Sequence, residues 1–255
     1  YLDDEITAMP NLATAAALVT VGAGGTLSTV AGIPLYRDGA NSSIYTHDVS
    51  GTDNAAYSNT AFGITALDAI TSGDDNTAVG HDAAGAITTG ARNVALGHDA
   101  LYTNQSGDDN TSLGMGSMYA NTASGNTAVG KYALHANTSG TRNIAIGFDA
   151  YKASDTENDN LAIGYNAMVT NTAGGTGNVA VGNYAMDELT SGDYNTAIGY
   201  SSMHKLTTGL RNTGIGYLGG QFITTGDDNV CINGGPALTT GDKNIMIGTQ
   251  CGNNT

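Results

Sequence analysis

One five-residue pattern recurs along most of the chain, and its clearest copy is residues 143–147, Asn-Ile-Ala-Ile-Gly. The leading Asn occurs twelve times at intervals of 15 to 18 residues, most often 17. These residues are Asn59, Asn76, Asn93, Asn110, Asn126, Asn143, Asn160, Asn178, Asn195, Asn212, Asn229 and Asn244. A repeat this short cannot bury a core alone, so it must stack on its neighbours. The pattern therefore predicts a solenoid.

The residues after each Asn alternate in size. Counting the Asn as position zero, position one is Thr, Val, Ile or Leu, position three is always large and apolar, and position two is Ala, Ser or Gly in ten of twelve copies. Because side chains alternate along a strand, we expect positions one and three to face the core and position two to face outward. On this interpretation, Ile146→Asp should prevent folding by burying an unpaired charge.

The rest of the repeat predicts a corner, a second strand and a polar turn. Position four is Gly in eleven of twelve copies, and Gly readily adopts a positive φ. Position seven is usually Ala or Ser, often followed by Leu or Met, which we interpret as a second, shorter strand. We therefore expect an all-β fold, a flattened parallel β-solenoid of about twelve coils over residues 51–255. Residues 1–50 lack the repeat, and are expected to form an N-terminal connector or capping region with extended segments near 18–21, 26–30, 33–36 and 43–45.

Stacked coils would place the Asn side chains above one another, where their amides can form a ladder along the rod. The predicted ladder residues are Asn76, Asn93, Asn110, Asn126, Asn143, Asn160, Asn178, Asn195 and Asn212. Cys231 and Cys251 occupy places where other repeats carry small residues, and both are interpreted as small apolar fillers.

Charge and hydropathy argue against two kinds of partner. Eight Lys and Arg against 23 Asp and Glu give a net charge of −15. Binding of nucleic acid phosphates needs the opposite charge, so no nucleic acid partner is expected. No apolar run reaches the length of a membrane span, so membrane insertion is not expected either.

The module Asn-Thr-Ala-Val-Gly-x-x-Ala-Leu, complete at residues 126–134 and varied throughout 59–252, resembles the head repeats of trimeric autotransporter adhesins. It resembles related repeats in bacteriophage tail fibres still more closely. The resemblance implies a left-handed parallel β-roll in a homotrimeric fibre on a virion, with other virion or fibre proteins and a host cell-surface receptor as partners. A bacterial cell-surface adhesin is the alternative. The long period and the lack of a coiled-coil stalk or membrane anchor in this sequence favour the tail fibre.

Position five is the candidate for receptor contact. Its members include His81, His98, Phe148, Tyr165, Tyr200 and Tyr217, with Tyr102, Tyr119, Tyr132 and Tyr184 nearby in sequence. Aromatic rings beside amides and carboxylates suit carbohydrate, because ring faces pack against sugar C–H groups. The alternative is that these rings cover coil edges or line a subunit interface.

Two groups of side chains in the repeats have the chemistry to bind a metal ion. His81 and His98 on adjacent coils could hold a transition metal, and the acidic turns at 74–75, 108–109 and 227–228 could bind calcium. The default interpretation of both is structural, so no metal or cofactor is predicted. A solenoid glycosidase, the second alternative function, would need two carboxylates about 5–10 Å apart in a groove. No such pair stands out, so we predict no catalytic residue and no enzyme.

Overall fold

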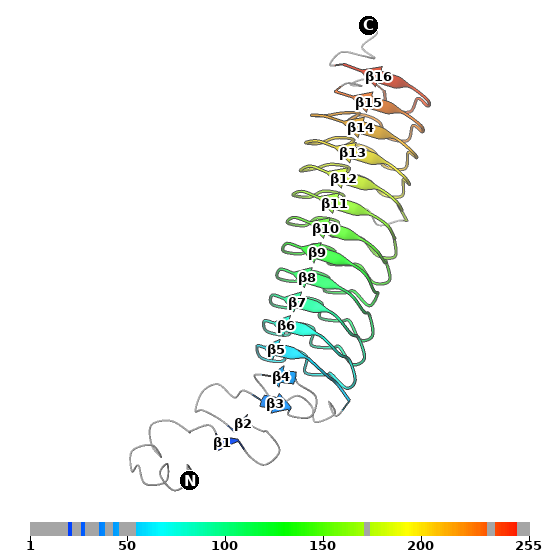
Figure 1. Ribbon diagram of the computed structural model, residues 1–255. Helices are drawn as coiled ribbons and strands as arrows, with labels where there is room; N and C mark the ends of the chain where they lie inside the picture. The colour runs from blue at the N-terminus through cyan, green and yellow to red at the C-terminus, as the bar shows by residue number, and fades with distance from the viewer. Residues whose placement is uncertain are drawn as a thin grey trace, which may run out of the picture.

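The chain forms a rod of stacked coils that follow one another in sequence order from one end to the other (Figure 1). This computed structural model describes residues 55–170, 174–233 and 238–248 in full, together with the backbone of four short strands nearer the N-terminus. These residues contain no helix, and accordingly no helix in the described part could cross a membrane. The predicted all-β solenoid with a period of about 17 residues is confirmed.

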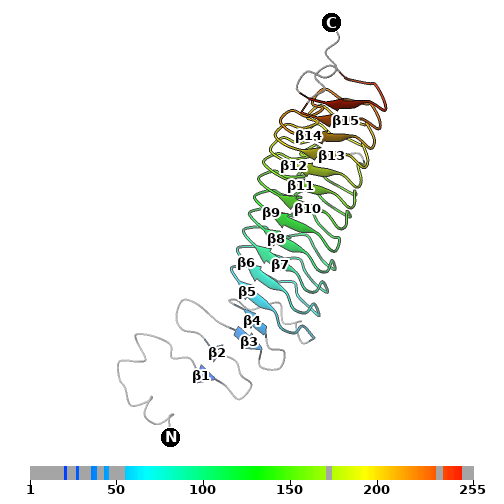
Figure 2. The same cartoon turned by 45° about the horizontal axis from the view of Figure 1, so that its top comes forward.

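Each repeat contributes one strand of three residues. The strands are β5 Thr60–Phe62, β6 Thr77–Val79, β7 Val94–Leu96, β8 Thr111–Leu113, β9 Thr127–Val129, β10 Ile144–Ile146, β11 Leu161–Ile163, β12 Val179–Val181, β13 Thr196–Ile198, β14 Thr213–Ile215, β15 Val230–Ile232 and β16 Ile245–Ile247. They pair in parallel in chain order, and the register keeps equivalent positions together, as in Ala145 between Ala128 and Ala162. Figure 2 shows the strands along one side of the rod and loops along the other. At about 4.8 Å per step, the stack is about 50 Å long.

Four further strands precede the first full coil. β1 (Thr20–Val21) pairs antiparallel with β2 (Leu27–Ser28), and β3 (Tyr36–Asp38) pairs antiparallel with β4 (Ser43–Tyr45). β4 then continues the large sheet by pairing in parallel with β5. A hairpin from the region predicted to be a connector or cap therefore covers the outer edge of β5, where exposed backbone groups would otherwise invite pairing with another chain.

The strand side chains point in the direction opposite to the one predicted. Ala145 is completely buried, whereas Ile144 and Ile146 are 40% and 37% exposed. The same pattern, a buried central residue between two more exposed ones, holds in all twelve strands from β5 to β16. The reason is the narrow interior of the coil. Large buried side chains such as Leu134 and Met168 fill the interior from the turn that follows each strand, so most strands have room there only for a small side chain, and Met246 of β16 is the exception.

The predicted second strand at position seven is also wrong. The residues on either side of Ala150 have positive φ angles, 51° at Asp149 and 49° at Tyr151, so the chain turns tightly instead of extending. Both Ala150 and Tyr151 are completely buried. The turns still bond from coil to coil, because the backbone N–H of Leu134 donates to the carbonyl of Ala150 at 3.1 Å.

The Asn side chains form a continuous buried ladder. The Oδ1 of Asn143 accepts the backbone N–H of Asn160 at 3.0 Å, and its Nδ2 donates to the carbonyl of Glu157 at 2.6 Å. The backbone N–H of Asn143 in turn donates to Oδ1 of Asn126 at 2.9 Å. The bond from backbone N–H to the preceding Asn Oδ1 repeats at every step from Asn59 to Asn244. All nine predicted ladder residues take part in this chain of bonds.

The corner depends on glycine after eleven of the twelve strands from β5 to β16, and Asn233, with a φ of 49°, takes this place after β15. Gly147 has a φ of 138°, and a Cβ at this residue would lie 2.3 Å from the carbonyl oxygen of Gly164 in the next coil. Any side chain there would push the coils apart, so the Gly is required both by its backbone angle and by the close approach.

Of the two cysteines, Cys231 is completely buried and is not in a disulfide. Burial raises the pKa of its thiol to about 11, which disfavours the reactive thiolate. Its position matches the predicted apolar filler. Cys251 lies outside the described residues.

Candidate functional site

The position-five side chains form a stripe along one edge of the rod, because the parallel register repeats the same corner in every coil. We call the side chains at position five from His81 to Tyr217 the position-five stripe. The predicted aromatic receptor residues are all exposed, by 41% at Phe148, 42% at Tyr165, 48% at Tyr200 and 69% at Tyr217.

Neighbouring rings of the stripe cover one another's faces. Phe148 and Tyr165 stack with centroids 5.4 Å apart and planes 9° apart, and Tyr200 and Tyr217 stack at 5.7 Å and 16°. Tyr184 joins the two pairs by edge contacts of 5.4 Å to Tyr165 and 5.9 Å to Tyr200. Phe148, Tyr165, Tyr200 and Tyr217 of the position-five stripe and Tyr184 from position six therefore form one continuous row of rings.

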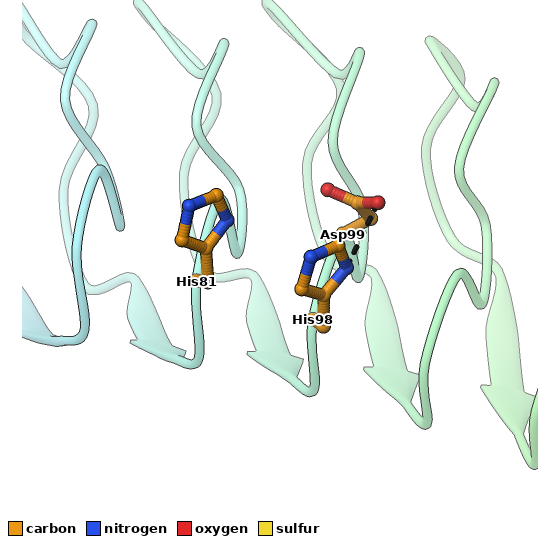
Figure 3. Close-up of side chains that lie close together, drawn as sticks. All are labelled: His81, His98 and Asp99. Atoms are coloured by element: carbon orange, nitrogen blue, oxygen red, sulfur yellow. Dashed lines mark ion pairs between the residues drawn. The ribbon is translucent and has the colours of Figure 1, made fainter.

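The two imidazoles of the stripe form a separate group, because Met115 and Lys131 lie between them and Phe148 in the register. His81 and His98 stack with centroids 5.1 Å apart and planes 9° apart. Figure 3 shows the two rings side by side on neighbouring coils, with the carboxylate of Asp99 next to His98.

A pocket of about 500 Å³ opens at the same corner of the rod. It is lined by His98, Asp99, Met115, Gly116, Tyr119, Tyr132, His135 and Lys152. Gly116 makes room for the Tyr132 ring, which is part of the pocket wall. A Cβ at residue 116 would lie 2.8 Å from this ring, so the ring can lie in this position only over a glycine.

The walls of the pocket combine aromatic and charged groups. Tyr119 stacks on His135 with centroids 5.2 Å apart, and the Nζ of Lys152 lies 5.2 Å from the centroid of Tyr132. The same Nζ contacts Asp149 Oδ2 at 3.0 Å. The volume is in the range of small-molecule sites, and such walls suit a ligand with both hydroxyl groups and an apolar face, such as a sugar.

Sequence reasoning found His98 but did not find His135 or Lys152 as parts of this site. Both lie at position nine, where neighbouring coils carry Tyr102 and Tyr119. The sequence signal that could have identified His135 and Lys152 was therefore a second column of residues, at position nine, with the same period. A similar column member, His204, contacts Asp187 through Nδ1 and lies 3.4 Å from Glu188 Oε1 through Nε2. Partial burial raises the pKa of the Asp187 carboxyl.

The acidic turns use their oxygens within the chain. The Oδ1 of Asp108 accepts the backbone N–H of Ala91 at 2.8 Å, and Asp109 pairs with Arg92 at 2.6 Å. The Arg92 guanidinium lowers the pKa of the Asp109 carboxyl. Asp227 and Asp228 make the same two contacts, with Leu210 and Arg211. These carboxylates tie each coil to the preceding one.

The outward side of the sheet is a second candidate surface. We call positions one and three of strands β5 to β16 the aliphatic face. It contains Thr, Val, Leu, Ile and one Phe, without a single charged residue. Its side chains are exposed or half-buried throughout; Ile146 is 37% exposed, and Phe62 and Ile247 near the two ends are 56% and 63% exposed.

Comparison with known proteins assigns no family. No family model, curated protein or solved structure matches the chain. The surfaces described above are therefore the basis for any assignment of function.

Proposed function

We propose that the chain is a structural fibre subunit that associates with two copies of itself through the aliphatic face. The resulting homotrimer displays the position-five stripe and the adjacent pocket for attachment to carbohydrate on a host cell. A virion tail fibre or appendage is the setting that the repeat resemblance favours. The observation that carries the proposal is the uncharged, apolar and exposed sheet surface along the rod.

The size of the aliphatic face supports burial in an assembly. A stack about 50 Å long with strands about 10 Å wide presents roughly 500 Å² of sheet. Monomeric proteins rarely expose contiguous apolar patches larger than a few hundred Å². Leaving this surface in water would be unfavourable by about 25 cal/mol for each Å² of apolar area.

A copy of the same chain is the partner that fits best. An identical rod offers the same two columns of side chains, with the same spacing, over its whole length. Because the chain carries a net charge of −15, close contact between copies is most favourable through the face without charges. Closed cyclic symmetry is the usual arrangement of homo-oligomers, and the resemblance of the repeats favours three chains.

The test is the mass and shape of the protein in solution, by light scattering and small-angle X-ray scattering. We expect about three times 25.7 kDa and a rod-like profile. The double variant Val129→Glu and Ile146→Glu puts charges on adjacent strands of the aliphatic face, and should give folded monomers. The matched control, Ser106→Glu and Ser139→Glu, adds the same charge at exposed turns and should remain trimeric. A monomeric native chain, or a trimer that tolerates the face variant, would contradict the proposal.

A further inference from the structure

We propose that His81, His98 and Asp99 form a binding site for a transition-metal cation that links two adjacent coils. The site depends neither on trimer formation nor on receptor binding. One ligand atom from each of these three residues lies within 4.8 Å of the other two. Figure 3 shows all three side chains on the same side of the rod.

The parallel register is what brings the two imidazoles together. His81 follows β6 and His98 follows β7, and these strands pair with Thr77 beside Val94 and Val79 beside Leu96. Each His is the second residue after its strand, so the two side chains leave neighbouring coils at equivalent points. The backbone thus fixes the pair without any contribution from a loop of variable length.

Each ring is held by the carboxylate of the following residue. His81 Nδ1 lies 2.8 Å from Asp82 Oδ2, and His98 Nδ1 lies 2.9 Å from Asp99 Oδ2. A cation bound on the Nδ1 side of His98 takes the place of the proton shared with Asp99, so that Nδ1 and a carboxylate oxygen are both ligands and the ring proton is on Nε2.

Asp99, rather than Asp82, is suited to be the third ligand. The Thr65 hydroxyl donates to Oδ1 of Asp82, so both oxygens of that carboxylate have partners. Thr65 is the position-six residue of the preceding coil. The corresponding residue before Asp99 is Asp82 itself, whose carboxylate has no proton to donate. The second oxygen of Asp99 therefore receives no hydroxyl from the preceding coil, so this carboxylate is freer than that of Asp82 to turn towards a cation held by the two imidazoles.

Closing the site requires the two stacked rings to turn, because an imidazole binds a cation in its own plane. Two nitrogens on one cation lie at most about 4.2 Å apart, because each metal–nitrogen bond is about 2.1 Å long. The side chains of His81 and His98 are 50% and 56% exposed, so the stacked rings can turn towards each other without disturbing the core. Water would fill the remaining positions on the side that opens to the pocket, which His98 and Asp99 also line.

The donor set determines the class of cation. Two imidazoles and one carboxylate suit Zn²⁺, Ni²⁺ and Cu²⁺, with Cu²⁺ bound most tightly by the usual order of stability. Calcium and magnesium prefer sites made of oxygen atoms. The net charge of −15 also favours a cation over an anion.

Calorimetric titration of the untagged chain with each metal salt alone tests this site. We expect one Cu²⁺, Ni²⁺ or Zn²⁺ per chain and no heat of binding with Ca²⁺. His81→Gln and His98→Gln should each weaken binding at least tenfold, and Asp99→Asn should weaken it less. His204→Gln is the control, because His204 also contacts carboxylates but has no second imidazole beside it.

Two results would overturn the site: no transition-metal binding by the native chain, or binding that survives loss of both His81 and His98. Circular dichroism of each variant checks that the coils remain folded. The same samples give the oligomer mass, so failure of the metal site and failure of self-association are separate outcomes.

Discussion

Asn143 shows how one residue connects three coils. Its side-chain amide bonds forward to the backbone of Asn160 and Glu157, and its backbone N–H donates back to Oδ1 of Asn126. These backbone groups lie inside the rod, away from water. The Asn side chain therefore supplies hydrogen-bond partners to the backbone of the buried turn, as strand pairing supplies them in the sheet. This role could be predicted from sequence because Asn is the one polar residue found in every repeat directly before an apolar strand.

Asn143→Ala should destabilise the rod by about 1–3 kcal/mol for each of the two buried partners that it leaves unpaired. These partners are the N–H of Asn160 and the carbonyl of Glu157. Urea denaturation followed by circular dichroism measures the change. Ser139→Ala, at an exposed residue of the turn that precedes Asn143, should change stability by less than about 0.5 kcal/mol. Equal stability of the two variants would show that the ladder contributes little.

At the scale of one strand, alternation showed which residues share a side but did not show which side is inside. The usual rule that the largest apolar residues are buried suggested Ile144 and Ile146. In the coil, however, the interior beside the strand is already filled by larger side chains from the turn that follows each strand, such as Leu134. That packing depends on the positive φ angles at positions six and eight, which the residue types there, among them Asp149 and Tyr151, did not indicate.

The two strand positions should therefore respond to mutation in opposite ways. Ala145→Leu adds three carbons where no space exists, and overpacking of this kind typically costs about 1–3 kcal/mol. Ile146→Asp, which the sequence alone suggested would prevent folding, is now expected to leave the coils folded. Thermal unfolding of the two variants distinguishes these expectations. Loss of folded structure in Ile146→Asp with a stable Ala145→Leu would reverse the assignment of the two faces.

At the scale of the whole molecule, a repeat predicts columns of residues more reliably than it predicts pockets. The position-five stripe followed directly from the period. The pocket did not, because it needs residues from two columns and one glycine, Gly116, where most other coils have a side chain. Trimer formation and handedness stay predictions, since both rest on resemblance and on the unfilled aliphatic face.

A trimer would present three copies of the stripe and pocket at once, so attachment should depend on assembly. Linked sites can bind a surface 10²- to 10⁴-fold more tightly than one site. The monomeric variant Val129→Glu and Ile146→Glu should therefore lose most binding to immobilised host-cell glycans. Tyr132→Ala should lose binding while remaining trimeric, because its ring forms part of the pocket. Surface plasmon resonance measures both, and unchanged binding by Tyr132→Ala would place the receptor site elsewhere.

The ladder also allows the length of the rod to change in equal steps. The Oδ1 of each Asn accepts the backbone N–H of the next Asn in the ladder, whether the interval is 15, 16, 17 or 18 residues. The differences in length are absorbed between the strands, and the register of the sheet is unchanged. Duplicating or deleting one whole coil within the sequence would thus change the length of the rod by about 4.8 Å. The contacts between the neighbouring coils would stay the same. Length can in this way be adjusted in small, equal increments by events that add or remove one unit of the gene.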